Sequence, residues 1–177
     1  ALEHDSCSLY SSVANRAQLP GGVPGPLPLG VAVIDASIVL FGHVFPRVLQ
    51  KHRLQLLHHF EDSIKQAKTR QAVQTNIFGG LLAALRAIAD AKTGLGNGGD
   101  ELKKGLFNLI QNALINSNCP SLRCAAAEAM GRLAQIQSQC AADSRFVNEA
   151  IQASFEKLKN SRDAASRTGH SVALSCL

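Results

Sequence analysis

Aromatic residues are scarce in this chain. None of its 177 residues is Trp, one is Tyr, and aromatic residues make up 5% of the total. Antiparallel β-sandwiches are usually rich in aromatic strand residues, and proteins that bind single-stranded nucleic acid stack bases on aromatic rings. The composition therefore disfavours both of these classes.

The chain also lacks a segment in which basic or acidic residues are concentrated. The 18 Lys and Arg exceed the 13 Asp and Glu, which gives a net charge of +5. Residues 1–60 carry four basic and three acidic side chains, whereas residues 61–120 and 121–177 each carry seven and five. Because nucleic-acid-binding modules gather their basic residues on one face or arm, we expect no nucleic-acid partner.

Cysteine pairs and long apolar runs are missing as well. The five cysteines are an odd number without a Cys-x-x-Cys pair, which indicates reduced thiols in a cytoplasmic protein. Residues 1–17 contain no apolar run of the kind that forms a secretory signal. The apolar stretch 27–48 contains Asp35, Pro46 and Arg47, so we expect peripheral membrane contact at most.

The sequence contains no convincing catalytic, cofactor or metal motif. There is no G-x-S-x-G elbow, and the carboxylate pairs Glu61/Asp62 and Asp100/Glu101 are neighbours expected on helix surfaces. Adjacent His58 and His59 would point about 100° apart on a helix, so they cannot chelate one ion together. We therefore predict a protein that is not an enzyme and binds no cofactor or metal.

The glycine-rich segment 94–99 matches the G-x-G-x-x-G pattern of dinucleotide-binding loops. That motif requires a strand before the glycines, whereas the preceding residues 81–92 have helical periodicity. Asp100 and Glu101 would also repel a phosphate from the helix that follows. We interpret the segment as a flexible loop between helices, with Asp100 as the N-cap of the next one.

The chain divides into an arm and a helical region. Residues 1–30 form the predicted arm or linker, because 19–30 contain four prolines and four glycines. Apolar residues then recur at helical spacing, and no alternating run is long enough for a strand. The class is all-α, with the first helix apolar nearly all round and expected to be buried. The predicted helices span residues 31–43, 46–67, 70–92, 100–117, 120–137, 144–160 and 163–177.

Two of these segments repeat each other. Residues 120–133 align with residues 164–177 at an offset of 44, which superposes Arg123 on Arg167 and Ala129 on Ala173. A weaker copy surrounds Gln74. Helix pairs that recur with a period in the forties are typical of HEAT and armadillo arrays. We therefore predict an α-α superhelix of about three helix pairs, spanning residues 31–92, 100–137 and 144–177, in which small residues let neighbouring units approach closely.

The segment Asn-Cys-Pro-Ser-Leu-Arg-Cys-Ala-Ala-Ala-Glu-Ala-Met-Gly-Arg-Leu at 118–133 resembles the turn and second helix of a HEAT repeat. Several strings between residues 29 and 177 are similar to the HEAT-repeat-containing protein 5 family. They are Val-Phe-Pro-Arg (44–47), Lys-His-Arg-Leu-Gln-Leu-Leu (51–57), Ile-Lys-Gln-Ala-Lys (64–68), Gln-Thr-Asn-Ile-Phe (74–78), Leu-Arg-Cys-Ala-Ala (122–126) and Ser-Arg-Thr-Gly-His-Ser (166–171).

The resemblance implies a fragment of a long cytoplasmic scaffold that performs no chemistry. The family that this chain resembles consists of large accessory proteins of the clathrin-adaptor complex, which act in vesicle traffic at the trans-Golgi network and endosomes. The implied partners are the adaptor complex or its accessory proteins.

Two sets of residues are candidates for contact with a partner. The second helices of a solenoid usually line its binding surface, which selects Arg123, Glu128, Arg132 and Arg167; the aligned arginines could instead form hydrogen bonds between repeats. The alternative function is a helical module that binds anionic lipid, and the basic residues that would contact the surface are Lys51, Arg53, Lys65, Lys68 and Arg70. The same cluster could be an ordinary solvated helix face.

An open repeat array exposes apolar surface at its ends. Because the apolar pattern runs up to Leu177 without a cap, we expect an exposed apolar end there and some self-association.

Overall fold

The computed structural model describes residues 29–67, 71–96, 99–116, 119–141 and 145–177, and the described part of the chain is helical with no strand. The predicted all-α class is confirmed. The elements are α2 (Leu29–Val44), the short 3₁₀ helix η2 (Phe45–Arg47), α3 (Gln50–Gln66), α4 (Gln71–Ala91), α5 (Gly99–Asn116), α6 (Pro120–Ala141), α7 (Arg145–Asn160) and α8 (Ala164–Cys176).

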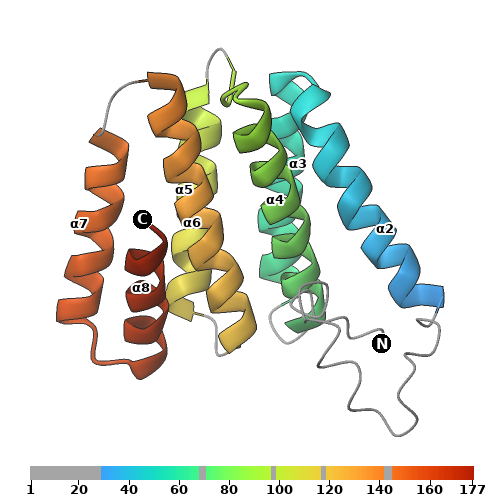
Figure 1. Cartoon of the computed structure of the whole chain (residues 1–177). Helices are drawn as coiled ribbons and strands as arrows, with labels where there is room; N and C mark the ends of the chain where they lie inside the picture. Colours follow the sequence, from blue (N-terminus) through green and yellow to red (C-terminus); the bar gives the residue numbers. More distant parts are fainter. Residues whose placement is uncertain (1–28, 68–70, 97–98, 117–118, 142–144) are drawn as a thin grey trace, which may run out of the picture.

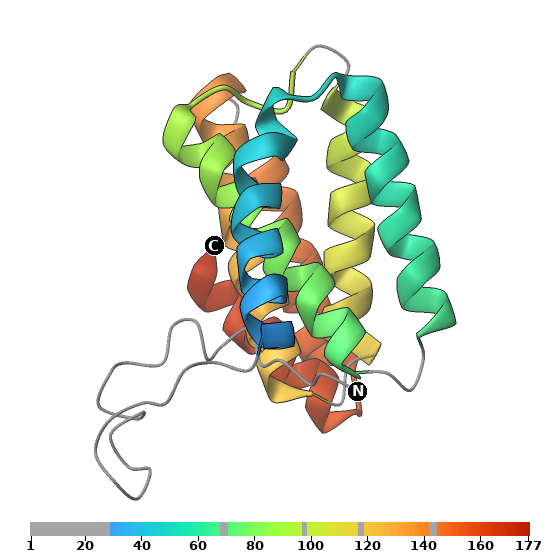
Figure 2. The same ribbon diagram turned by 90° about the vertical axis from the view of Figure 1, so that its right-hand side faces the viewer.

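The helices form two layers. In one layer α4 packs between α2 and α6, and α6 packs in turn against α8. The other layer contains α3, α5 and α7, and α5 and α7 pack against the helices that follow them in the chain. Figure 1 shows α2, α4 and α6 side by side with α3 and α5 behind them, and Figure 2 views the two layers from the side of α2. Each later helix pair therefore contributes one helix to each layer.

The core lies between the layers and is built from the predicted apolar stripes. Burial of these side chains supplies most of the free energy that holds the layers together. The helix α4 is long and apolar enough to cross a membrane, yet 56% of its most apolar stretch is buried inside the protein. It is the central core helix. Fully buried large side chains include Phe78, Leu81, Leu85 and Ile88 of α4, Leu102, Leu106 and Ile110 of α5, and Met130, Leu133 and Ile136 of α6.

Glycines lie where helices cross most closely. A Cβ atom on Gly42 of α2 would lie 2.8 Å from the Cβ of Ala83 in α4, and one on Gly169 of α8 would lie 2.6 Å from the carbonyl oxygen of Leu114 in α5. A Cβ atom on Gly131 of α6 would lie 2.5 Å from the carbonyl oxygen of Cys176. A Cβ cannot approach other atoms so closely, so these crossings need residues without a side chain. This agrees with the predicted use of small residues for close helix packing.

The start of α3 differs from the prediction. A single helix over residues 46–67 was expected, but Pro46 lies in η2, and α3 begins only at Gln50. Between them Val48 and Leu49 are extended, with ψ angles of 154° and 148°. Arg53 stabilises this break because its guanidinium donates to the carbonyl oxygens of Pro46 and Val48. Sequence periodicity alone does not reveal such a tertiary contact.

Two other predicted helices begin at an acidic residue, and these two residues have different roles in the structure. Asp163 caps α8, and its carboxylate accepts a hydrogen bond from the Ser166 amide at 2.7 Å. Asp100 was predicted to cap its helix, but α5 begins at Gly99, and Asp100 lies in the first turn, paired with Lys103 at 2.7 Å. The preceding glycine loop is also less free than expected, because Leu95 is buried and its carbonyl accepts from Arg53 at 3.1 Å.

The expected distribution of exposed apolar surface was wrong at both ends. The first helix was expected to be buried, but α2 exposes Leu29, Val33 and Leu40 at 81%, 56% and 63%. Leu177, which was expected to be exposed, is half-buried and packs against the core. The reason is that α2 has a neighbour on one side only among the described helices, whereas the chain end lies against α6.

The close crossing of α2 and α4 gives a direct test. Gly42→Ala should lower the free energy of unfolding by about 1–3 kcal/mol, because the added methyl group meets Ala83. Gly80→Ala at the same interface is the matched control, since its Cβ would lie 3.6 Å from Phe41 in ordinary contact. That variant should be unchanged or more stable by up to about 1 kcal/mol, from helix propensity. Urea unfolding measures both, and equal effects of the two substitutions would contradict the packing argument.

His170 of α8 is a titratable residue that is buried inside the protein. Its side chain is 0% exposed, and among the described residues neither ring nitrogen has a hydrogen-bond partner. Burial lowers the pKa of His170 from its ordinary value, and the positive charge of Lys157 on α7 lowers it further. At neutral pH the folded protein therefore holds His170 in its neutral form.

The lowered pKa predicts a stability that depends on pH. The unfolded chain takes up a proton at His170 as the pH falls through about 6.5, whereas the folded chain takes it up only at a lower pH. The stabilisation is complete above about pH 6.5 and is lost as the pH falls through the lower folded-state pKa. Urea unfolding between pH 7.5 and pH 5 should show this loss, and His170→Leu should remove part of it. The exposed His59 is the control: if His59→Leu reduces the pH dependence equally, burial of His170 is not its cause.

Candidate protein-interaction face

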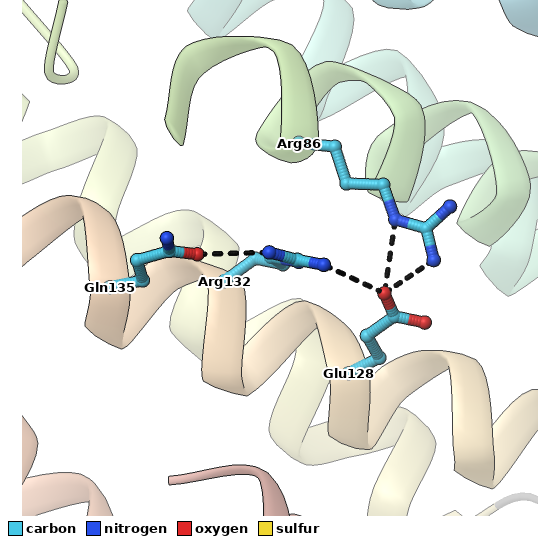
Figure 3. Close-up of polar contacts among 4 residues, drawn as sticks. All are labelled: Arg86, Glu128, Arg132 and Gln135. Carbon is cyan, nitrogen blue, oxygen red and sulfur yellow. Dashed lines mark hydrogen bonds and ion pairs between the residues drawn. The ribbon is translucent and has the colours of Figure 1, made fainter. Parts of the chain in front are cut away.

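Two of the four predicted partner-binding residues meet in one polar cluster between α4 and α6. Glu128 of α6 accepts a hydrogen bond from Nε of Arg86 at 3.0 Å, and Nη2 of Arg86 also donates to the same oxygen. Nη2 of Arg132 lies 3.6 Å from that oxygen, and Nη1 of Arg132 donates to Gln135 at 3.0 Å. Figure 3 shows Glu128 between the two arginines. We call Arg86, Glu128, Arg132 and Gln135 the α4–α6 polar cluster.

The α4–α6 polar cluster is partly open to solvent. Relative to full exposure, the side chains of Arg86, Arg132 and Glu128 are 26%, 35% and 36% accessible. Ion pairs at this level of exposure contribute little to stability but can orient charged groups toward a partner. Two guanidinium groups around one carboxylate leave one net positive charge, so the cluster suits an acidic group on a partner.

An open groove begins at this cluster. It has a volume of about 670 Å³ and runs over α6 toward the end of α8. Glu128, Arg132 and Gln135 form a polar wall, while Val147 of α7 and Leu177 supply apolar surface. The groove is therefore able to accept a segment that combines an acidic side chain with apolar side chains. Its remaining lining residues are Gly131, Ala134, Ser138 and Cys176.

The two aligned arginines do not join the cluster. Arg123 is half-buried at the contact between α6 and α8, where its Cδ would lie 3.3 Å from a Cβ on Gly169. This position fits the contact between repeats that was considered as its alternative role. Arg167 is exposed and lines a separate shallow groove with Leu158 and Val172. Among the described helices none follows α8 in this layer, so none of them lies beside Arg167 as α8 lies beside Arg123.

The five basic residues proposed for lipid contact do not form one exposed surface in the described chain. Arg53 donates to three backbone carbonyls and lies over the ring of Phe45, so its guanidinium has a structural role. Burial lowers the pKa of Arg53 from its ordinary value. Lys51 and Lys65 are exposed but lie about 21 Å apart along α3, at 1.5 Å per residue. Lys68 and Arg70 lie outside the described residues.

Sequence analysis missed Arg86 and a second groove. Arg86 lies in an apolar helix, and only its separation of 42 residues from Glu128, close to the repeat offset, could have indicated the pairing. The second groove, of about 530 Å³, lies between α3, α4 and α5 and is lined by polar side chains that no motif marks. These are Glu61, Lys65, Gln74, Asn108 and Asn112. Among the described residues no group of three His, Cys, Asp or Glu side chains is arranged to hold a metal ion.

The ion pair between α4 and α6 can be measured by a double-mutant cycle. Arg86→Gln and Glu128→Gln should show a coupling energy of about 0.5–1 kcal/mol that decreases in high salt, as expected for a partly exposed pair. The same cycle with Arg132→Gln should give a smaller coupling, because that contact is longer and lies within one helix. A larger coupling for Arg132 than for Arg86 would contradict the assignment.

No protein-family model matches the chain, and no solved structure matches it significantly. The functional assignment therefore depends on the geometry of the α4–α6 face and on the resemblance seen in the sequence.

Proposed function

We propose that this chain is a protein-interaction scaffold of the HEAT-repeat type, which binds other proteins and performs no chemistry. The observation that carries the proposal is the side-by-side packing of α4, α6 and α8, with Arg86 and Glu128 paired across 42 residues. Helix pairs that repeat at this interval and stack in one direction are the basis of α-solenoids. Such arrays present the side chains of one helix layer to their partners.

The proposed binding face is the groove that begins at the α4–α6 polar cluster. Its polar wall carries Glu128 and Arg132, and its far end carries Val147 and Leu177. The positive charge of the cluster favours acidic segments, and the apolar end provides burial for one or two hydrophobic side chains. These are the properties expected of a surface that recognises short segments of partner proteins.

The proposed partners are the clathrin-adaptor complex or its accessory proteins, in the cytoplasm near the trans-Golgi network and endosomes. This step depends on the resemblance of residues 29–177 to the HEAT-repeat-containing protein 5 family. The lipid-binding alternative is less favoured, because Arg53 is engaged in structural contacts and the two exposed lysines of α3 lie far apart.

The proposal is tested by binding of purified clathrin-adaptor complex to the immobilised chain. Arg132→Glu should weaken binding at least tenfold, because it reverses the charge of the polar wall. Lys159→Glu on α7 is the matched control, since it makes the same change in charge at an exposed position outside the groove, and it should bind like the unaltered chain.

Two outcomes would contradict this proposal in different ways. If neither the adaptor complex nor its accessory proteins bind a folded chain, the proposed partners are wrong. If they bind and Arg132→Glu has no greater effect than Lys159→Glu, the partners are right and the proposed face is wrong. Flotation with anionic liposomes that disappears in high salt would instead favour the lipid-binding alternative.

A further inference from the structure

The carboxylate of Glu128 occupies the point where two guanidinium groups of the α4–α6 polar cluster converge. Nε and Nη2 of Arg86 donate to its oxygen Oε1, and Nη2 of Arg132 lies 3.6 Å from the same oxygen. Figure 3 shows that all three contacts go to this one oxygen. A site formed by two arginines therefore holds a carboxylate that belongs to the protein itself.

Glu128 is not an ideal ligand for these two guanidinium groups. A carboxylate binds a guanidinium most strongly when each of its oxygens accepts one of two parallel hydrogen bonds. Here both donors of Arg86 share one oxygen, and Arg132 lies beyond hydrogen-bond distance from it. A carboxylate on another molecule is not tied to α6, so it is free to place one oxygen against each arginine.

Glu128 also separates Arg86 from the proposed binding groove. The groove is lined by Glu128 and Arg132, whereas Arg86 is not among its lining residues. The Glu128 side chain is 36% exposed, and an ion pair at this level of exposure contributes little to stability. Rotation of Glu128 into solvent therefore costs little, and it opens Arg86 to a ligand in the groove.

We propose that Glu128 is an internal competitor of the acidic partner. In the free protein its carboxylate occupies the site formed by Arg86 and Arg132, and a carboxylate on the partner segment displaces it. Arg86 then becomes a partner-binding residue, and the ion pair between α4 and α6 breaks when the partner binds. This inference rests on the proposed function, because it takes an acidic protein segment as the ligand of the groove.

The first test is the effect of Glu128→Gln on binding of the purified clathrin-adaptor complex. This variant removes the competing carboxylate, so the two arginines carry two net positive charges instead of one. Binding should tighten about two- to fivefold, the factor expected from a partly exposed ion pair. Glu156→Gln on α7 is the matched control, since it makes the same change in charge at an exposed position outside the groove, and it should bind like the unaltered chain.

Glu128→Asp separates occupancy of the site from its net charge. The shorter side chain keeps the negative charge but withdraws the carboxylate from Arg86 by one methylene group. If Glu128 competes for the arginines, Glu128→Asp should also bind more tightly than the unaltered chain. Binding equal to that of the unaltered chain would mean that net charge alone matters, and it would overturn the competition.

The second test does not need the adaptor complex. A tri-glutamate peptide with blocked ends, added to the nitrogen-15-labelled chain, should shift the side-chain Nε–H resonances of Arg86 and Arg132 in NMR spectra. Half-saturation should require several-fold less peptide in Glu128→Gln than in the unaltered chain. Adding Arg86→Gln to Glu128→Gln should remove this gain, because the peptide then loses the arginine that Glu128 had covered.

The two tests distinguish failure of this inference from failure of the proposed function. If the peptide binds as expected but neither the adaptor complex nor its accessory proteins bind, Glu128 is a competitor and the proposed partners are wrong. If Glu128→Gln binds the peptide no more tightly than the unaltered chain, or if the peptide leaves Arg86 unchanged, the competitor role is wrong whatever the adaptor complex does. Weaker adaptor binding by Glu128→Gln would also overturn it, because Glu128 would then contribute to the binding surface.

Discussion

Close approach of neighbouring helices is the constraint on which this structure depends. The contacts at Gly42, Gly131 and Gly169 leave no room for a Cβ atom, and fully buried alanines such as Ala84 and Ala127 continue the pattern. Helices that cross so closely bring their large side chains into the space between the two layers, where leucine and isoleucine fill the core. Close packing within the layer also sets the distance across which Arg86 reaches Glu128.

The polar features follow from this packing. The α4–α6 polar cluster exists because two adjacent helices of one layer carry complementary charges at the same height, and its partial exposure makes it more suited to recognition than to stability. Arg53 shows the opposite case. Its guanidinium holds the break before α3 and the loop at Leu95 together, so a residue that looked like surface charge is part of the framework.

Sequence periodicity predicted most of the helices because burial of one face imposes a 3.6-residue repeat on a helix. The predicted segments agree closely with α4, α6, α7 and α8, and Pro120 and Asp163 mark the starts that were expected from them. The errors occurred where local signals compete with tertiary contacts. Pro46 lies in a separate short helix, Asp100 lies inside its helix, and α2 is exposed on one face although its composition is typical of a buried helix.

The sequence by itself determined the helical class, the positions of most helices and the similarity of residues 120–133 to residues 164–177. These features depend on patterns local to each segment. Only the tertiary structure decided which charges meet. Glu128 and Arg132 join Arg86, a residue that no motif marks, while Arg123 and Arg167 separate although the repeat aligns them. The reason is physical: a helix sequence specifies which face is apolar, but the surroundings of a side chain depend on the neighbouring helix. Arg123 has α8 beside it, whereas none of the described helices lies beside Arg167 in the same way.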